Sequence, residues 1–269
     1  MLQREDIEQI MEIFHSSQKI EASFDFKDIK PKERTSPVFA IDGGSGCVVG
    51  NRGLAVVAAR ACALPFFTDA TPILSGTRTK IMNSKDVPDF AKATDEFRNS
   101  IEIEVFLKVV ESGFSGIILT DGILPPTAGH SNSRVLSVAK DSKVMYGDLP
   151  LLYAVEQAAG RSGPWMSTVD KRNIVCFSSI SNDAYFVDGD IDDALPEILP
   201  LCYDPYALGY PYPLERAHRE SHMSPKDMAA IGIQIEQKMI EEGMSPDLIE
   251  QIFKNRHGVV DQFKNGGAR

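Results

Sequence analysis

Short apolar segments separated by polar or glycine-rich stretches cover the first third of the chain and predict strands. The segments "VFAID" (38–42), "CVVG" (47–50) and "LAVVAARACAL" (54–64) are typical of the strands of a meander, with "GGSG" (43–46) as a turn. The segment "TPILSGTRTKIM" (71–82) is compatible with one more strand. Residues 21–37 are polar and contain prolines, which indicates a connector.

Helical spacing of apolar positions appears at both ends of the chain and between the strands. The segment "IEQIMEIF" predicts an amphipathic helix over about 3–18, and "ATDEFRNSIEIEVFLKVVES" (93–112) predicts a second helix that ends at Gly113. The segment "LLYAVEQAAG" (151–160) predicts a third helix. The C-terminal region predicts three more, over about 212–222, 224–243 and 245–256, and the last two begin with Ser-Pro, a good N-cap and first-turn pair.

The middle of the chain alternates helices with strands. The segment "GIILTDG" (116–122) is almost wholly apolar, as in a central strand covered on both faces. "RVLSVAK" (134–140) predicts another strand, and "NIVCFSSI" (173–180) with "AYFVDGD" (184–190) predicts a late strand pair. A helix followed by such a central strand is typical of the α/β class.

Composition narrows the functional classes. The 269 residues carry a net charge of −10, which argues against broad non-specific binding of nucleic acid, although a local basic channel is compatible with it. No apolar run approaches the roughly 18 residues that span a bilayer, and the N-terminus lacks the features of a signal peptide, so we expect a cytoplasmic protein. The four cysteines lie far apart, which predicts buried thiols. No P-loop, GxGxxG or GxSxG motif is present.

Two apolar strands end on the same signature, "AIDGG" at Asp42 and "ILTDG" at Asp121. A carboxylate at the end of a buried strand is costly unless it is paired or binds a metal. If the strands are neighbours, the two carboxylates converge at one edge of the sheet, where Mg²⁺ or Mn²⁺ would prefer their oxygens. The alternative is two Asp-Gly turns, which are common.

Other candidates are weaker when taken singly. Glu102 and Glu104 lie among apolar residues of the predicted helix and compete for a third carboxylate position, the alternative being a solvated helix face. His218 and His222 are four residues apart on one helical face, without the Glu that a metalloprotease motif needs directly after the first His. Lys140 at a strand end could neutralise carboxylates or contact a phosphate, or it could simply be solvated.

Taken together, these residues resemble the NurA-type nucleases over about residues 35–225. The matching features come in one order: "AIDGG", "SGTRTK", "RNSIEIE", "ILTDG", "LSVAKDS" and "GYPYPLERAHRESHMS". The last string is the most specific of them. The resemblance implies a ribonuclease-H-like mixed sheet flanked by helices, with a helical C-terminal region.

The resemblance also implies a function and a site. It implies a DNA nuclease that uses one or two Mn²⁺ or Mg²⁺ ions, acts 5′ to 3′, often cuts single strands internally, and works as a homodimer with a hexameric HerA-type translocase in DNA end resection. By position, the implied metal and catalytic residues are Asp42, Glu102, Asp121 and His218, with Lys140 catalytic as well. The expected substrate contacts are Arg78 and Lys80, as basic residues that could line a local channel, and Tyr210, which lies in the last string and is expected to help shape the site.

The resemblance has departures and leaves alternatives. The second strand reads "DGILP" where the family often has Asp-Gly-Ser-Leu, and the chain is short for the family. We expect a single domain over 1–269, with the helix at 3–18 and the helices at 213–263 as dimer or partner elements. An actin-like or sugar-kinase-like phosphotransferase begins with a similar strand, Asp and glycine turn. A third reading is a non-catalytic dimeric clamp for a translocase.

Overall fold

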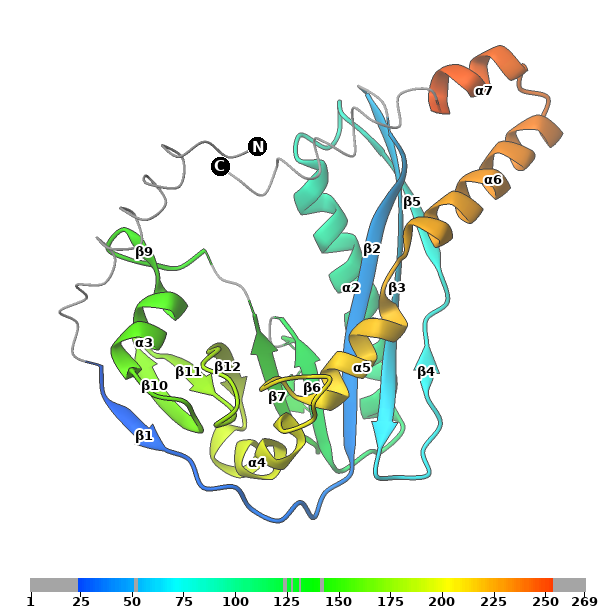
Figure 1. The fold of residues 1–269 in the computed structure, drawn as a ribbon. Coiled ribbons are helices and arrows are strands. Elements are labelled where there is room, and N and C mark those ends of the chain that lie inside the picture. Colours follow the sequence, from blue (N-terminus) through cyan, green and yellow to red (C-terminus); the bar gives the residue numbers. More distant parts are fainter. Residues whose placement is uncertain are drawn as a thin grey trace. The chain divides into compact units, whose positions relative to one another are not determined.

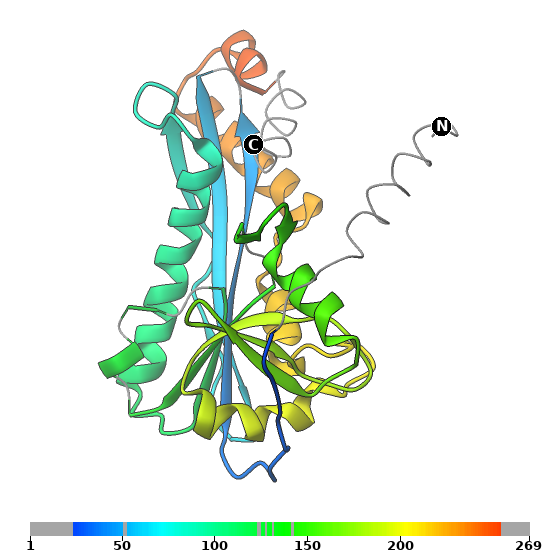
Figure 2. The ribbon, with the colours of Figure 1, turned by 90° about the vertical axis from the view of Figure 1, so that its left-hand side faces the viewer.

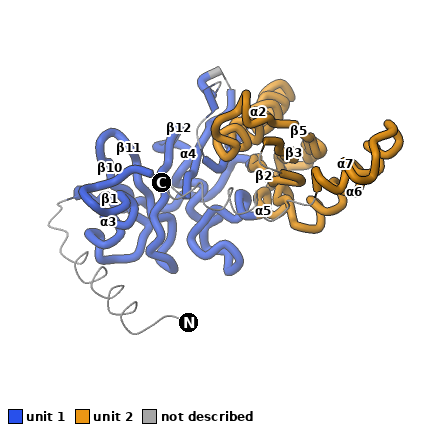
Figure 3. The backbone as a smooth tube through the Cα atoms, turned by 90° about the horizontal axis from the view of Figure 1, so that it is seen from above, with its two compact units in different colours: residues 1–38, 115–215 blue, residues 39–114, 216–269 orange. Residues whose placement is uncertain are grey.

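The computed structural model describes residues 24–50, 53–122, 125–126, 128–130, 132–140 and 143–253. The helix expected at 3–18, and the part of the C-terminal region beyond 253, lie outside these residues. The chain divides into two compact units (Figure 3). Unit 1 comprises residues 1–38 and 115–215, and unit 2 comprises residues 39–114 and 216–269.

Unit 1 contains a mixed β-sheet (Figure 1). Its described strands follow the order β1 (Phe26–Asp28), β10 (Trp165–Val169), β11 (Arg172–Cys176), β12 (Tyr185–Gly189), β7 (Arg134–Ala139) and β6 (Ile117–Asp121). β6 and β7 are parallel, whereas the other neighbours in this order are antiparallel. The parallel pair brings the ends of β6 and β7 to the same edge, because Asp121 is in register with Val138.

Helices cover the sheet of unit 1. α3 (Leu151–Ala159) packs Leu151 and Val155 into a core formed with Trp165 and Ile174 of the sheet. α4 (Ile191–Ile198) packs along β7. Smaller elements complete the unit: 3-10 turns at Ala128–His130 and Leu199–Cys202, and a hairpin of β8 (Met145–Tyr146) and β9 (Leu149–Pro150).

Unit 2 is built on two 13-residue strands, β2 (Val38–Gly50) and β3 (Leu54–Phe66). β4 (Ile73–Leu74) and β5 (Arg78–Asn83) are antiparallel to β3. The long helix α2 (Phe90–Glu111) runs along β3 (Figure 2). α5 (Tyr212–Ser221) ends in unit 2 and is followed by α6 (Pro225–Glu241) and α7 (Pro246–Phe253).

Alternation along β3 explains which helix covers which face of the unit 2 sheet, because successive side chains of a strand point to opposite faces. Ala55 and Val57 pack with Phe97 of α2. Val56 packs instead with Ile249 of α7, and Cys62, of the same parity, donates a hydrogen bond to the carbonyl of Ala217 in α5. α2 therefore covers one face, and α5 and α7 cover the other.

Some predicted boundaries are wrong. The "GGSG" turn does not exist, because β2 runs unbroken through these four residues. The segment at 71–82 forms two strands, β4 and β5, and the connector at 21–37 contains β1, which pairs with β10. β10 and α4 were not predicted. Glycines usually interrupt strands, so local reasoning could not anticipate that these ones serve close packing instead.

Apart from the short hairpin of β8 and β9, which was not predicted, the other strands and helices agree with the predictions. α2 begins at Phe90, capped by the Asp89 side chain, which accepts a hydrogen bond from the Lys92 amide, and the helix is followed by Gly113 at a φ of 76°. α6 begins with the predicted Ser-Pro pair, in which Ser224 and Asp227 form a capping box. The predicted class, a mixed sheet flanked by helices with a helical C-terminal region, is confirmed. None of the described helices is long and apolar enough to cross a membrane.

Candidate active site

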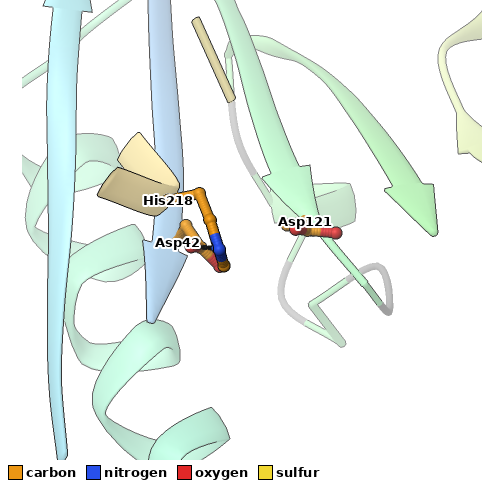
Figure 4. Close-up of side chains that lie close together, drawn as sticks. All are labelled: Asp42, Asp121 and His218. Carbon is orange, nitrogen blue, oxygen red and sulfur yellow. Dashed lines mark hydrogen bonds and ion pairs between the residues drawn. The ribbon is translucent and has the colours of Figure 1, made fainter. Parts of the chain in front are cut away.

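Asp42 is the buried carboxylate of unit 2, with 5% of its surface exposed. Its Oδ2 atom accepts a hydrogen bond from the hydroxyl of Ser221 at 2.9 Å and lies 3.0 Å from Nδ1 of His218. Both partners lie in the last turn of α5, three residues apart and therefore on one helical face. Figure 4 shows the contact between Asp42 and His218, and also labels Asp121 at the end of β6.

The His218 imidazole is held in one orientation by this contact. An ionised carboxylate only accepts hydrogen bonds, so Nδ1 of His218 carries the proton that points at Asp42. In the neutral ring Nε2 is then the unprotonated nitrogen. About half of the His218 side chain is exposed.

The glycines after Asp42 permit three close approaches to β2. A Cβ at Gly43 would overlap the carboxylate of Glu102, and a Cβ at Gly44 would overlap the backbone carbonyl of Ser221. At Gly46 a Cβ would come 3.0 Å from the sulfur of Met228. The glycine run therefore lets α2 approach one face of the strand, and α5 and α6 the other.

Glu102 belongs to α2 and lies against Gly43, on the opposite face of β2 from the Asp42 side chain. Its carboxylate forms an ion pair with Nε of Arg98, one turn earlier, at 3.2 Å. About a fifth of the side chain is exposed. The missing side chain at Gly43 is what allows the Glu102 carboxylate to approach this strand closely.

Glu104, the competing glutamate, pairs with Arg78 of β5. Its two carboxylate oxygens accept hydrogen bonds of 2.9 and 2.7 Å from the guanidinium of Arg78. These bonds lower the pKa of Glu104. The bidentate pair favours Glu102 over Glu104 as the functional carboxylate, and it engages Arg78, a predicted substrate contact. Lys80, two residues along β5, places its Nζ 5.7 Å from the ring centroid of Phe97.

Unit 1 contributes a second group of predicted residues. Asp121 ends β6 and Lys140 directly follows β7, and their charged atoms lie 3.9 Å apart. The Nζ of Lys140 also lies 3.9 Å from the ring centroid of Tyr210, a cation–π contact. Tyr210 is buried and packs in turn on Tyr185. The parallel pairing of β6 and β7 explains why Asp121 and Lys140 meet.

Sequence reasoning missed two residues, Ser221 and Arg60. Ser221 is 1% exposed and binds Asp42 directly, while Arg60 of β3 donates from Nε to the carbonyl of Ser221 at 3.1 Å. The signal available for Ser221 was its position one turn after His218. Nothing local pointed to Arg60, which sits in an apolar strand and lies 161 residues from Ser221.

Cys62, which also lies close to this region, is not a nucleophile. Burial raises the pKa of its thiol to about 12, and the neighbouring Asp42 carboxylate acts in the same direction. The thiol therefore stays protonated at neutral pH.

Comparison with solved structures identifies the fold. The NurA nuclease from Sulfolobus solfataricus aligns over 91% of this chain and 100% of its own, with a TM-score of 0.61 at 16% identity. The chain has the fold of a NurA nuclease. Endonuclease V from Ciona intestinalis, in complex with DNA, aligns over 80% of this chain and 96% of its own, with a TM-score of 0.40 at 16% identity. No protein-family model and no curated protein matches the sequence.

The NurA fold confirms the resemblance predicted from the sequence strings at the level of architecture. At 16% identity it does so without sequence similarity strong enough to carry over residue roles. Those roles depend on the chemistry of the two groups described above, Asp42 with His218 and Ser221 in unit 2, and Asp121 with Lys140 and Tyr210 in unit 1.

Proposed function

We propose that this protein is a divalent-metal-dependent DNA nuclease of the NurA type. The observation that carries the proposal is the buried Asp42, which ends the apolar half of β2 and is hydrogen-bonded to His218 of the "GYPYPLERAH" string. A carboxylate held in that way on the NurA fold is suited to phosphodiester hydrolysis. The acidic net charge is compatible with it, since cations bound at carboxylates can meet the phosphates of the substrate.

The donor set fits a hard divalent cation. Asp42 and Asp121 offer carboxylate oxygens, the ligand type that suits Mg²⁺ and Mn²⁺, and His218 offers a ring nitrogen, a ligand type of transition-metal ions. Glu102 is the fourth candidate and rests on the NurA resemblance; its carboxylate approaches β2 at Gly43, on the face opposite the Asp42 side chain. We propose that these four residues hold one or two ions, with Mn²⁺ as the first candidate. When bound, the metal would activate a water molecule and stabilise the charge that develops on the phosphate.

The protein residues have separate tasks in this proposal. Asp42 accepts a hydrogen bond from the Nδ1–H group of His218, and the Nε2 atom is proposed to hold a metal or to exchange a proton with the leaving oxygen. Lys140 is held by Asp121 and by the face of Tyr210, so its ammonium group is placed to contact a phosphate. Arg78 and Lys80 on β5 are proposed to contact the DNA backbone, for which Arg78 would have to exchange Glu104 for phosphate.

The finer parts of the proposal follow the NurA resemblance. They are 5′-to-3′ action on single- and double-stranded DNA ends, internal cleavage of single strands, homodimerisation, and cooperation with a HerA-type translocase in end resection. The C-terminal helices are the proposed dimer or partner elements, together with the predicted N-terminal helix.

Asp42→Asn tests the function. The amide keeps the size of the side chain but loses the negative charge, so we expect degradation of 5′-labelled DNA in Mn²⁺ to fall by about 100-fold or more. The control is Asp69→Asn, which removes an exposed carboxylate of unit 2. EDTA should abolish the wild-type reaction. Equal degradation by wild type and Asp42→Asn would show that the assignment is wrong.

Measurements of ATP binding and hydrolysis distinguish the phosphotransferase alternative from the nuclease. An actin-like or sugar-kinase-like protein binds and hydrolyses ATP through a second glycine-rich phosphate loop, and "TDGIL" is a poor match to one. Metal titration separates the clamp alternative, because a protein without a functional site would not bind Mn²⁺. Binding of Mn²⁺ without ATP hydrolysis is the result that the nuclease proposal expects.

A further inference from the structure

Two hydrogen bonds converge on a single oxygen of Asp42. Oδ2 accepts from the Ser221 hydroxyl at 2.9 Å and from Nδ1 of His218 at 3.0 Å. Among the described residues, the hydrogen bonds to the Asp42 side chain go to Oδ2, and Oδ1 is the oxygen that can take a different partner. A carboxylate fixed through one oxygen presents the other in a defined direction, which is how neighbouring groups orient metal ligands.

Ser221 is itself held rigidly. Its carbonyl lies against Gly44, where a Cβ would overlap it, and accepts a hydrogen bond from Nε of Arg60 at 3.1 Å. Its side chain is buried and its hydroxyl also lies 3.2 Å from the carbonyl of His218. A hydroxyl has one proton, so the shorter contact to the Asp42 carboxylate, which is also charge-assisted, takes it.

Arg60 joins the end of α5 to the start of α6. Its Nη2 donates to the carbonyl of His222, and its guanidinium lies 3.7 Å from the carboxylate of Asp227 in the α6 capping box. A cation at a helix C-terminus is favourable because the last carbonyls are unpaired and carry partial negative charge. The turn that carries Ser221 is therefore clamped from β3.

We propose that Ser221, clamped by Arg60, is the positioning residue for the metal-binding carboxylate of Asp42. Ser221 does not touch metal or substrate in this assignment. It restricts the rotation of the Asp42 side chain so that Oδ1 faces the ion, while His218 occupies the remaining site on Oδ2. This inference rests on the proposed function, because it gives Ser221 a role only if Asp42 binds a divalent cation.

Calorimetric titration of Mn²⁺ into the metal-free protein, without DNA, tests the inference. Ser221→Ala should weaken Mn²⁺ binding by about 10- to 100-fold, the usual effect of losing a residue that orients a ligand. Ser221→Thr keeps the hydroxyl and should restore part of the affinity. Ser167→Ala is the matched control, since it removes a buried serine hydroxyl in β10 of unit 1, and it should bind Mn²⁺ as the wild type does.

A merely structural role gives a different pattern. If Ser221→Ala binds Mn²⁺ within twofold of wild type, the inference is wrong, whatever its melting temperature. If that variant does not fold, Arg60→Lys replaces it, because lysine keeps the charge but lacks the planar guanidinium whose Nε and Nη2 atoms donate to the two carbonyls. We expect Arg60→Lys to weaken Mn²⁺ binding several-fold, and unchanged affinity would overturn the inference. Failure of the wild type to bind Mn²⁺ would instead count against the proposed function.

Discussion

At the residue scale, the partners that each carboxylate already contacts restrict its role in the candidate site. Asp42 is buried, and its Oδ2 accepts hydrogen bonds from His218 and Ser221, so the orientation of the carboxylate is fixed. Glu104 is taken by Arg78, whereas Glu102 lies against the strand that carries Asp42. The two glutamates look equivalent in "RNSIEIE", and their partners distinguish them.

Glu102→Gln and Glu104→Gln should therefore differ. Glu102→Gln removes a proposed metal ligand and should lower nuclease activity by about 10-fold or more, with a higher Mn²⁺ concentration needed for half-maximal rate. Glu104→Gln breaks an exposed pair with Arg78 and should leave the Mn²⁺ requirement unchanged. Rate measurements across a Mn²⁺ series make the comparison. The reverse order of effects would assign the ligand role to Glu104.

At the element scale, β2 carries Asp42, and α5 carries His218 and Ser221. β2 continues through Gly43, Gly44 and Gly46, and each glycine faces a different neighbour. Parity along the strand assigns these neighbours: Gly43 faces α2, whereas Asp42 and Gly44 face α5. Substitutions at adjacent glycines should therefore affect different properties.

Gly44→Ala should destabilise the fold. Its Cβ would overlap the backbone carbonyl of Ser221, which cannot move without shifting α5, so we expect a loss of about 1–3 kcal/mol, the usual cost of overpacking. Thermal unfolding followed by circular dichroism measures it. Gly53→Ala is the control, because its Cβ would meet its nearest neighbour, the Ser84 hydroxyl, at an ordinary 3.6 Å. Equal melting temperatures for both variants would contradict the packing role of Gly44.

At the scale of the whole molecule, each unit has its own core and its own buried polar network. In unit 1 the network centres on Glu197 of α4. One of its oxygens accepts from Arg134 at 2.8 Å, and the other accepts from the amides of Thr35 and Ser36 at 3.0 and 3.1 Å. This carboxylate joins the segment before β2 to β7 and α4.

Glu197→Gln should destabilise unit 1 in a pH-dependent way. Burial opposes ionisation of Glu197, but the hydrogen bonds from Arg134, Thr35 and Ser36 outweigh it and lower the pKa from 4.5 to about 2. A lowered folded-state pKa stabilises the fold above pH 4.5, and the contribution is lost as the pH falls from 4.5 toward 2. At pH 7 we expect a loss of about 2–3 kcal/mol, the range for a hydrogen-bonded charged group.

Urea unfolding followed by tryptophan fluorescence measures this effect in unit 1. Trp165 is the single tryptophan of the chain and is buried in that unit, so its emission reports on the relevant core. The difference between wild type and Glu197→Gln should be largest at pH 7 and smaller at pH 3. Asp28→Asn, which breaks an exposed pair with Arg161, should cost less than about 1 kcal/mol. A pH-independent difference would exclude the ionised network as the cause.

The sequence by itself determined most of the elements and the catalytic candidates. Periods of two and 3.6 residues are local, so the first part of β2 up to Asp42, the strand that ends at Asp121, α2 and the Ser-Pro helices could be predicted from short windows. The order of "AIDGG", "ILTDG" and "GYPYPLERAH" indicated the NurA resemblance, and the fold agrees with it.

Only the tertiary structure decided what surrounds those candidates. Ser221 lies 179 residues from Asp42, and Arg60 lies 161 residues from Ser221, so no local pattern connects them. "GGSG" looked like a turn because glycine usually ends strands, but packing of helices on both faces of β2 made the missing side chains necessary. The choice between Glu102 and Glu104 likewise depends on long-range partners, Gly43 and Arg78, that sequence spacing does not reveal.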